Sequence, residues 1–436
     1  MGCAIVSPVS DDDRYTEDES ELARVCSPIP RVEPLTVRGD KIARILAHAV
    51  VRHKWPRIEF RQLTITDSVF IEDLDLPADI VFAECMFQGS ACLTNLSAIR
   101  SLTFLDCTIP KLFVHHCDMT RNLMVFLGDV QQIDIEGLHL TGSKEQSVKL
   151  ESSGWLDLIS LTADAPVRMD LRGERILLTQ ASLTSGGRVA CEAEYVMADN
   201  ASFGARTVIA GRTFHGKQLT HLYSLDGADC TNLELDNLDL SGVHFGKASG
   251  LGKLRIVDQP NFPLNPGRLS SRRQVIADEL THGGSAAQWR RVSEVYRQLR
   301  AGMDDARASD MYYGEMNCRR LGTPWSVDRF VLTLYWLTSG YGTRAWRALA
   351  SWGVLLAGAT GLFISRWPEA VKAPSFGKSL WRGFRHAFES STALLRASEG
   401  AAQPDVAIAE WVLRLLTPAL IGLAVLALRN RVKRGA

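Results

Sequence analysis

The sequence lacks the short motifs that identify most enzymes and metal sites. Its 436 residues contain no nucleophile elbow, no Walker loop and no H-E-x-x-H motif. We therefore expect a protein without catalytic activity and without a bound cofactor. The nine cysteines are odd in number, and none forms a C-x-x-C pair. This pattern argues against a disulfide framework and against a zinc site, and it favours a reduced, cytosolic setting for most of the chain.

The N-terminal segment lacks the apolar core of a signal peptide. It begins with "MGCAIVS", in which Val6 stands where a myristoylation motif requires serine or threonine. The run "SDDDRYTEDESE" at 10–21 is acidic and has a single aromatic residue. We therefore expect residues 1–34 to form a disordered acidic tail.

Charge is balanced over the whole chain but is unevenly distributed along it. The formal net charge is zero, yet residues 60–258 have 16 Lys and Arg against 26 Asp and Glu, whereas residues 259–436 have 24 against 13. An acidic middle and a basic end indicate two parts with different surroundings. A basic segment next to apolar runs is typical of the cytoplasmic face of a membrane.

The middle of the chain repeats with a period of about 20 residues. Phe82, Phe104 and Phe126 are spaced 22 apart, and "LTNL", "VHHC" and "IEGL" form a second ladder that begins at Leu93 and continues in steps of 21. A fixed period of this length predicts a solenoid. Short apolar–polar alternations with Asp, Asn and Gly between them favour a β-solenoid over leucine-rich repeats.

The clearest repeat begins at Ala228 and reads ADCTN, LELDN, LDLSG, VHFGK. Its apolar positions recur every five residues. They are the centres Cys230, Leu235, Leu240 and Phe245 and the positions two before them, Ala228, Leu233, Leu238 and Val243. This stretch resembles the pentapeptide-repeat family. The resemblance implies a right-handed quadrilateral β-helix with four five-residue faces per coil, and residues 60–262 would hold roughly nine coils.

Cysteines and histidines within the repeat have a structural explanation. Cys85, Cys107, Cys117 and Cys230 occupy inward ladder positions, where we expect them to pack in the core. One of two adjacent strand residues faces outward, so the pair at 115–116 predicts a surface histidine rather than a metal site. A helix within 35–59, carried by "DKIARILAHAVVRH", is expected to cap the first coil.

Residues 263–343 change to a helical pattern. Trp289, Val292, Tyr296 and Leu299 recur at three- and four-residue steps, and the aromatic segment 326–340 predicts a helix at the membrane interface. The alternative is a small globular helical bundle.

Two apolar runs in 344–436 are long enough to cross a bilayer, at about 346–367 and 411–429. Arg344 and Arg347 precede the first run, and four basic residues follow the second. The positive-inside rule then places both termini and the β-helix in the cytoplasm of an inner-membrane protein.

Between the runs, 379–398 has the pattern of a short pore helix. The order "YYGEM", "SGYGTR", span, "AFESST", span, basic tail resembles bacterial pentapeptide-repeat membrane proteins with a potassium-channel-like C-terminal domain. The resemblance implies a homotetramer in contact with membrane lipids. No G-Y-G follows "FESSTALL", so a potassium filter is not supported and we expect weak selectivity. The residues expected to line such a pore are Glu389, Ser390, Ser391, Thr392, Arg396 and Arg414.

Arg414 is the only ionisable residue inside the apolar run 411–428 of the second span, and the alternative is that it reaches out to the outer interface. "TSGYG" at 338–342 precedes the first span and cannot be a filter there. We interpret Gly340, Tyr341 and Gly342 as an elbow into the membrane, with Tyr341 at headgroup level. Pro418 and Gly422 predict either a hinge in the second span or a packing site.

The pattern therefore favours a gated, membrane-depolarising ion channel, such as an effector of anti-phage defence. Its cytoplasmic part would respond to a nucleotide, an oligonucleotide or a regulatory protein. Four arginines are candidates for binding phosphates, or else form a solvated helix face. They are Arg290, Arg291, Arg297 and Arg300. Two alternatives remain, which are a non-conducting membrane-anchored scaffold and a DNA mimic of the kind that binds gyrase.

Overall fold

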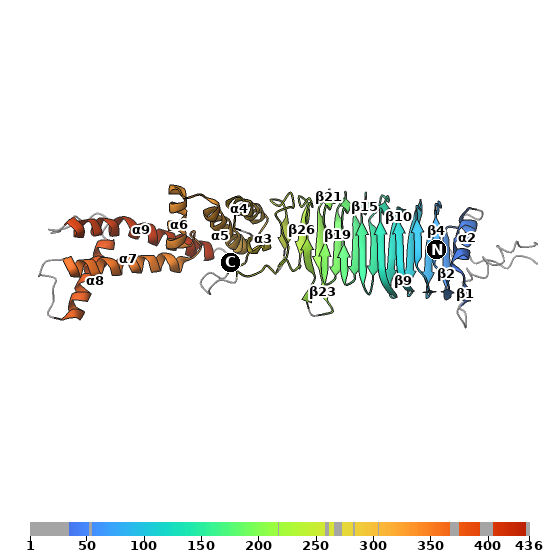
Figure 1. The fold of residues 1–436 in the computed structure, drawn as a ribbon, viewed down its shortest axis with the longest axis horizontal. Coiled ribbons are helices and arrows are strands. Elements are labelled where there is room, and N and C mark those ends of the chain that lie inside the picture. Colours follow the sequence, from blue (N-terminus) through green and yellow to red (C-terminus); the bar gives the residue numbers. More distant parts are fainter. Residues whose placement is uncertain are drawn as a thin grey trace, which may run out of the picture. The chain divides into compact units, whose positions relative to one another are not determined.

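The fold is described from a computed structural model, which divides into two compact units (Figure 1). The first unit comprises 1–281 with 301–303, and the second comprises 282–300 with 304–436. The residues that the structure describes are 35–51, 55–216, 218–257, 261–265, 273–281, 284–303, 305–366, 375–392 and 404–432.

The first unit is a parallel β-solenoid of about ten turns, as the repeat predicts (Figure 1). Successive coils add one or two strands to each of two long parallel sheets. The first sheet contains β1 (Leu35–Val37), β3 (Leu63–Ile65), β4 (Val69–Glu72), β6 (Met86–Phe87), β7 (Ala91–Thr94), β9 (Thr108–His115), β11 (Asp129–Glu136), β14 (Trp155–Ile159), β17 (Arg175–Leu177), β20 (Tyr195–Met197) and β25 (His221–Ser224).

The second sheet has fourteen strands. They are β2 (Arg57–Arg61), β5 (Asp79–Ala83), β8 (Ile99–Leu105), β10 (Asp118–Phe126), β12 (His139–Leu140), β13 (Gln146–Glu151), β15 (Thr162–Ala163), β16 (Val167–Arg172), β18 (Ser182–Leu183), β19 (Gly187–Glu192), β21 (Ser202–Phe203), β22 (Thr207–Gly211), β26 (Leu233–Asp236) and β27 (Arg255–Val257). A short antiparallel hairpin, β23 (Thr213–Phe214) and β24 (Gln218–Leu219), stands apart from both sheets.

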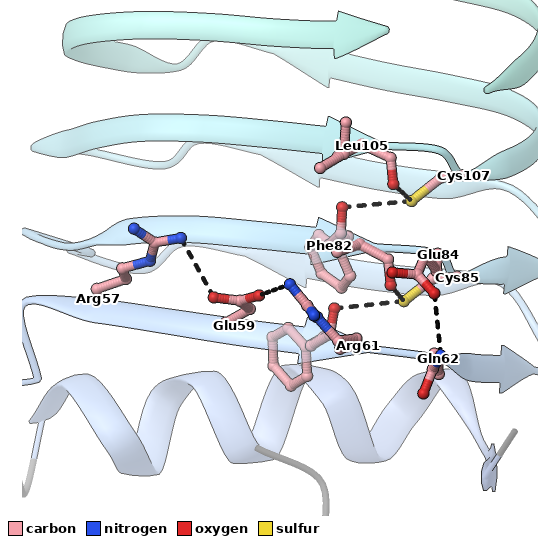
Figure 2. A network of polar contacts seen from close by, with 11 residues as sticks. Arg57, Glu59, Arg61, Gln62, Phe82, Glu84, Cys85, Leu105 and Cys107 are labelled. Carbon is pink, nitrogen blue, oxygen red and sulfur yellow. Dashed lines mark hydrogen bonds and ion pairs between the residues drawn. The ribbon is translucent and has the colours of Figure 1, made fainter. Parts of the chain in front are cut away.

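Stacked identical side chains fill the first coils (Figure 2). The ring of Phe82 lies 4.9 Å from that of Phe60 and 5.0 Å from that of Phe104, in stacked geometry. Cys85 Sγ donates to the Phe60 carbonyl at 3.4 Å, and Cys107 repeats this contact one coil later. The four cysteines predicted to be inward are buried and free, which confirms their packing role. Burial raises the pKa of the Cys230 thiol to about 12, so it stays protonated.

The predicted phenylalanine ladder is wrong at its third member. Phe104 pairs with Val125, and Phe126 pairs with Leu105 instead. This coil is one residue shorter than the one before it, and a one-residue shift moves a side chain to the other face of a strand. Phe126 consequently lies outside, where the Lys149 ammonium sits 4.5 Å from its ring centre. The second ladder is confirmed, because 93, 114 and 135 are paired in register.

The five-residue repeat is buried as predicted. The eight residues expected to face inward are each at most 1% exposed. Upstream, β8 to β11 are seven to nine residues long, so their coils have longer faces than the repeat implies. Helix α2 (Gly39–Val51) forms where the cap is expected and buries Ile42, Ile45 and Leu46. After the last coil, α3 (Ala277–Leu280) brings the buried carboxylate of Asp278 to the backbone N–H groups of Phe245 and Gly246.

The second unit is helical. α4 (Ala286–Ala301) and α5 (Asp305–Gly322) pack closely at Gly314, which has no side chain. A Cβ at this position would lie 2.6 Å from the ring of Tyr296. α7 (Ala345–Arg366) and α9 (Pro404–Val432) are long and apolar enough to cross a membrane. The unit also contains α6 (Val327–Ser339) and α8 (Phe376–Thr392).

Candidate functional site: a buried polar cluster in the α7–α9 group

α7, α8 and α9, here called the α7–α9 group, share a small apolar core. Gly383 lets α8 approach α7, because a Cβ there would lie 3.0 Å from Ile364 Cγ1 and 3.3 Å from the Thr360 carbonyl. The core residues come from all three helices and are Leu356, Ala359, Phe363, Ala387, Val406 and Leu413.

A carboxyl group is buried beside this core. Glu410 on α9 is 3% exposed, and each of its oxygens has a different partner. His386 Nε2 of α8 lies 3.0 Å from Glu410 Oε1, and the Arg414 guanidinium donates to Glu410 Oε2 at 3.3 Å. Glu410 and Arg414 are four residues apart, so they occupy the same helix face. We call His386, Glu410 and Arg414 the polar cluster.

Aromatic and hydroxyl side chains surround the polar cluster. The ring of His386 meets that of Phe363 edge-on at 5.1 Å, and this contact ties the cluster to α7. Ser390 and Ser391 on α8 and Thr417 on α9 are 5%, 2% and 2% exposed. Buried hydroxyl side chains therefore lie on the packed sides of α8 and α9, the two helices that also carry the polar cluster.

Burying ionisable side chains in this way costs free energy of hydration. A charge removed from water loses several kcal/mol of hydration, and its partners recover this only with good geometry. Ionisable groups inside apolar spans usually face protein or a water-filled path, and they mark ion or proton routes. The polar cluster can hold or relay charge beside an apolar core, which a plain anchor does not require.

The structure places the predicted pore residues in two groups. Ser390, Ser391 and Arg414 lie within the α7–α9 group, whereas Glu389 and Thr392 face outward. Glu389 accepts from Arg385 at 2.7 Å on the exposed side of α8. Arg396 lies outside the described residues.

Arg414 is not the only ionisable residue of its apolar helix. α9 begins at 404, so Glu410, which precedes the predicted span by one residue, belongs to the same helix. The sequence feature that could have identified Glu410 is the Glu-x-x-x-Arg spacing, which puts both side chains on one face of a helix. His386 had no such signal, because its partner lies 24 residues away. Pro418 lies inside α9, and a Cβ on Gly422 would meet nothing within 4 Å.

The predicted elbow has an unusual backbone. Gly340, Tyr341 and Gly342 all take left-handed conformations, with φ of 55°, 59° and 71°. Tyr341 is 1% exposed, so its predicted place at headgroup level is wrong. Its ring instead packs edge-on against Tyr313 and Tyr335, at 5.3 and 5.7 Å.

Burial has an electrostatic consequence at the elbow. It raises the pKa of the Tyr341 hydroxyl to about 12, although the nearby charge of Arg320 opposes this. Tyr341 therefore stays neutral and links α5, α6 and the start of α7.

Three of the four arginines proposed to bind phosphate have partners within the helical unit. Arg290 Nε donates to the Gly322 carbonyl at 3.0 Å. Arg297 pairs with Glu294 at 2.6 Å and Arg300 with Glu315 at 3.2 Å. Arg291 is exposed. These contacts favour a structural role for the helix face over an open phosphate site.

Comparison with known proteins leaves the function to be argued from this geometry. No family model, no curated protein and no solved structure matches the chain.

Proposed function

We propose that the chain is an oligomeric, gated ion channel anchored in the bacterial inner membrane by α7 and α9. The observation that carries this proposal is the polar cluster, a buried glutamate held by a histidine and an arginine inside an otherwise apolar group. Two spans per chain do not enclose a pore, so several copies, on the resemblance four, would surround it. Polar-lined, unfiltered pores of this kind select weakly.

The exposed surface of α6 supports a membrane setting. Its apolar side chains follow a helical stripe and are 49–78% exposed. The members of this stripe are Val327, Phe330, Val331, Leu334 and Leu337. A stripe of this kind fits a helix lying in the lipid interface, and Arg344 and Arg347, just before α7, favour the cytoplasmic side.

The proposal also covers the geometry of the solenoid and its role in gating. The buried five-residue step after 228 supports a right-handed quadrilateral β-helix for that part of the solenoid. A cytoplasmic solenoid would shift the closed–open equilibrium when a partner binds one state better than the other. Membrane depolarisation in anti-phage defence is the biological use that the resemblance suggests.

Conductance of the full chain in planar bilayers tests the proposal. We expect current from the wild type or from Glu410→Gln, and we expect the open probability or conductance of Glu410→Gln to differ from that of the wild type by about tenfold, which corresponds to ~1.4 kcal/mol. Glu389→Gln is the matched control, because that carboxylate sits on the exposed side of α8 and is expected to leave the current unchanged.

Two results would overturn the channel. One is a monomer in the bilayer, measured by cross-linking. The other is the absence of current from all of the wild type, Glu410→Gln and Arg414→Ala. The second candidate, a non-conducting anchored scaffold, is favoured by exposed aromatic side chains on the solenoid, such as Trp155 and Tyr223. It predicts that unrelated spans can replace α7 and α9 without loss of function.

A further inference from the structure

One face of the first sheet carries aromatic side chains in register. Strand pairing places Trp155, Arg175, Tyr195 and His221 in one row across β14, β17, β20 and β25. Trp155 is 50% exposed, and Tyr223, which lies at a register shift in β25, is 57% exposed. The ring of Tyr223 lies 6.0 Å from Tyr195 and 6.3 Å from His221. The rings of Tyr195, His221 and Tyr223 therefore lie together, and Arg175 stands between Tyr195 and Trp155 in the row.

A second row lies beside the first. Asp157, Leu177 and Met197 are in register on β14, β17 and β20. Leu177 and Met197 are half-buried, so their outer surfaces extend the apolar area between the aromatic rings. We call the two rows, together with Tyr223, the aromatic face. A solenoid strand normally presents polar side chains to water, and a patch of this kind marks an interaction site.

The charge around the aromatic face is negative. β11, β14, β17, β20 and β25 contain no lysine and a single arginine, Arg175. That guanidinium is already engaged, because it lies 4.3 Å from the ring centre of Trp155 and 3.0 Å from the Asp157 carboxylate. Glu174 and Glu194 stand at the entry to β17 and β20, both exposed, and the Glu194 N–H donates to the Glu174 carbonyl at 3.0 Å. Neither glutamate has an ion pair among the described residues.

We infer that the aromatic face binds an extended polypeptide segment of a partner protein, in which basic and aliphatic residues are mixed. The strands are ~4.8 Å apart, so Glu174 and Glu194 lie at one end of the aromatic row's strands, and Leu177 and Met197 form an apolar row on its other side. An extended chain offers side chains in a line, with aliphatic groups for the apolar row and cationic groups for the glutamates and the open aromatic rings. Nucleic acid is disfavoured because its phosphates would meet these carboxylates.

This inference extends the proposed function, because it names the chemistry of the partner that would control the channel. Its own readout is peptide binding, which is independent of current. Binding without conductance would leave the inference standing and remove the channel, and conductance without binding would do the reverse.

The test uses the full chain in neutral detergent and a fluorescein-labelled octapeptide of alternating arginine and leucine. We expect saturable binding that weakens with salt, and about tenfold weaker binding for Glu174→Gln/Glu194→Gln. The same loss is expected for Tyr223→Ala, which keeps the charges. The matched control is Asp106→Asn/Glu145→Gln, which removes two exposed carboxylates elsewhere on the solenoid and should bind like the wild type.

Three results would overturn the inference. The first is equal binding of the alternating glutamate–leucine peptide. The second is unchanged binding in both Glu174→Gln/Glu194→Gln and Tyr223→Ala. The third is full competition by spermine at a comparable concentration, which would assign the surface to simple polycations instead of a polypeptide.

Discussion

The solenoid and the α7–α9 group bury hydrophobic side chains in opposite ways. In the solenoid each coil covers the next, so inward residues such as Ile133 and Leu158 have no exposed surface. In α9, Leu415 and Val425 are 68% and 56% exposed, because only one side of the helix packs against α7 and α8. The coils of the solenoid cover its inward apolar side chains, whereas the exposed apolar side chains of the α7–α9 group require an apolar solvent or further copies of the group to cover them.

The polar groups show the reverse pattern. On the solenoid, charged pairs such as Arg212–Asp170 lie on the outside, where water screens them. In the α7–α9 group Glu410 is buried and Arg414 is largely buried beside it, and His386, with 34% of its side chain exposed, contacts Glu410 from α8. Ionisable residues that are buried on an apolar helix usually face protein or a polar path.

The largest expected effect is a difference in lost stability between two leucine-to-alanine variants, one in each region. Leu158→Ala should destabilise the solenoid by about 2–5 kcal/mol, because it leaves a cavity in a closed core. Leu415→Ala removes the same atoms from an exposed position and should change stability by less than about 0.5 kcal/mol in detergent. Urea unfolding, followed by circular dichroism at strand and helix wavelengths, measures both. Equal losses would show that α9 is covered by protein rather than by lipid.

The solenoid could be predicted largely from sequence because its repeat is a local spacing. Leu93, Val114 and Ile135 show the same spacing in the sequence and in the strands. The prediction failed at Phe126, because one coil is a residue shorter and the position 22 residues after Phe104 therefore falls on the outer face, and the sequence alone does not show which coil is shorter. A uniform repeat period can be recognised in the sequence, whereas the packing of the coils decides which coil departs from it.

The candidate site was harder to predict because its residues meet across helices. Arg414 was identified from its place in an apolar run, and Glu410 stood just before that run. His386 joins them only because α8 folds against α9, and no periodicity encodes that contact. Likewise the glycines of the elbow were recognised as flexible, but the burial of Tyr341 depends on tyrosines from two other helices.

The next effect tests whether backbone conformation, rather than apolar burial, orders the helical unit at the elbow. Gly342→Ala places a Cβ 2.8 Å from the Tyr335 hydroxyl in a left-handed conformation. We expect a loss of about 1–3 kcal/mol. Gly353→Ala is the matched control within α7, where a Cβ meets nothing within 4 Å, and it should be neutral or stabilising by up to about 1 kcal/mol. Thermal unfolding of the detergent-solubilised chain compares them, and equal values for the two variants would contradict an ordered elbow.

The smallest effect concerns a carboxylate on the solenoid surface. Burial raises the pKa of Asp134, and the neighbouring charges of Asp157 and Glu136 act in the same direction, against an opposing effect of His115. A raised pKa means that the folded state holds the proton more tightly than the unfolded state. Solenoid stability should therefore fall as the pH rises from the ordinary aspartate range through the raised pKa.

Asp134→Asn removes this dependence. Above that range the variant should be as stable as the wild type or more stable by a few tenths of a kcal/mol, roughly the size expected for a half-exposed group. Urea midpoints at several pH values measure the difference, and Asp106→Asn, at an exposed corner, is the control that should leave the pH profile unchanged. If the variant instead lost stability mainly at higher pH, the ion pair with His115 would outweigh burial. The solenoid surface would then depend on charge pairing, as the polar cluster does.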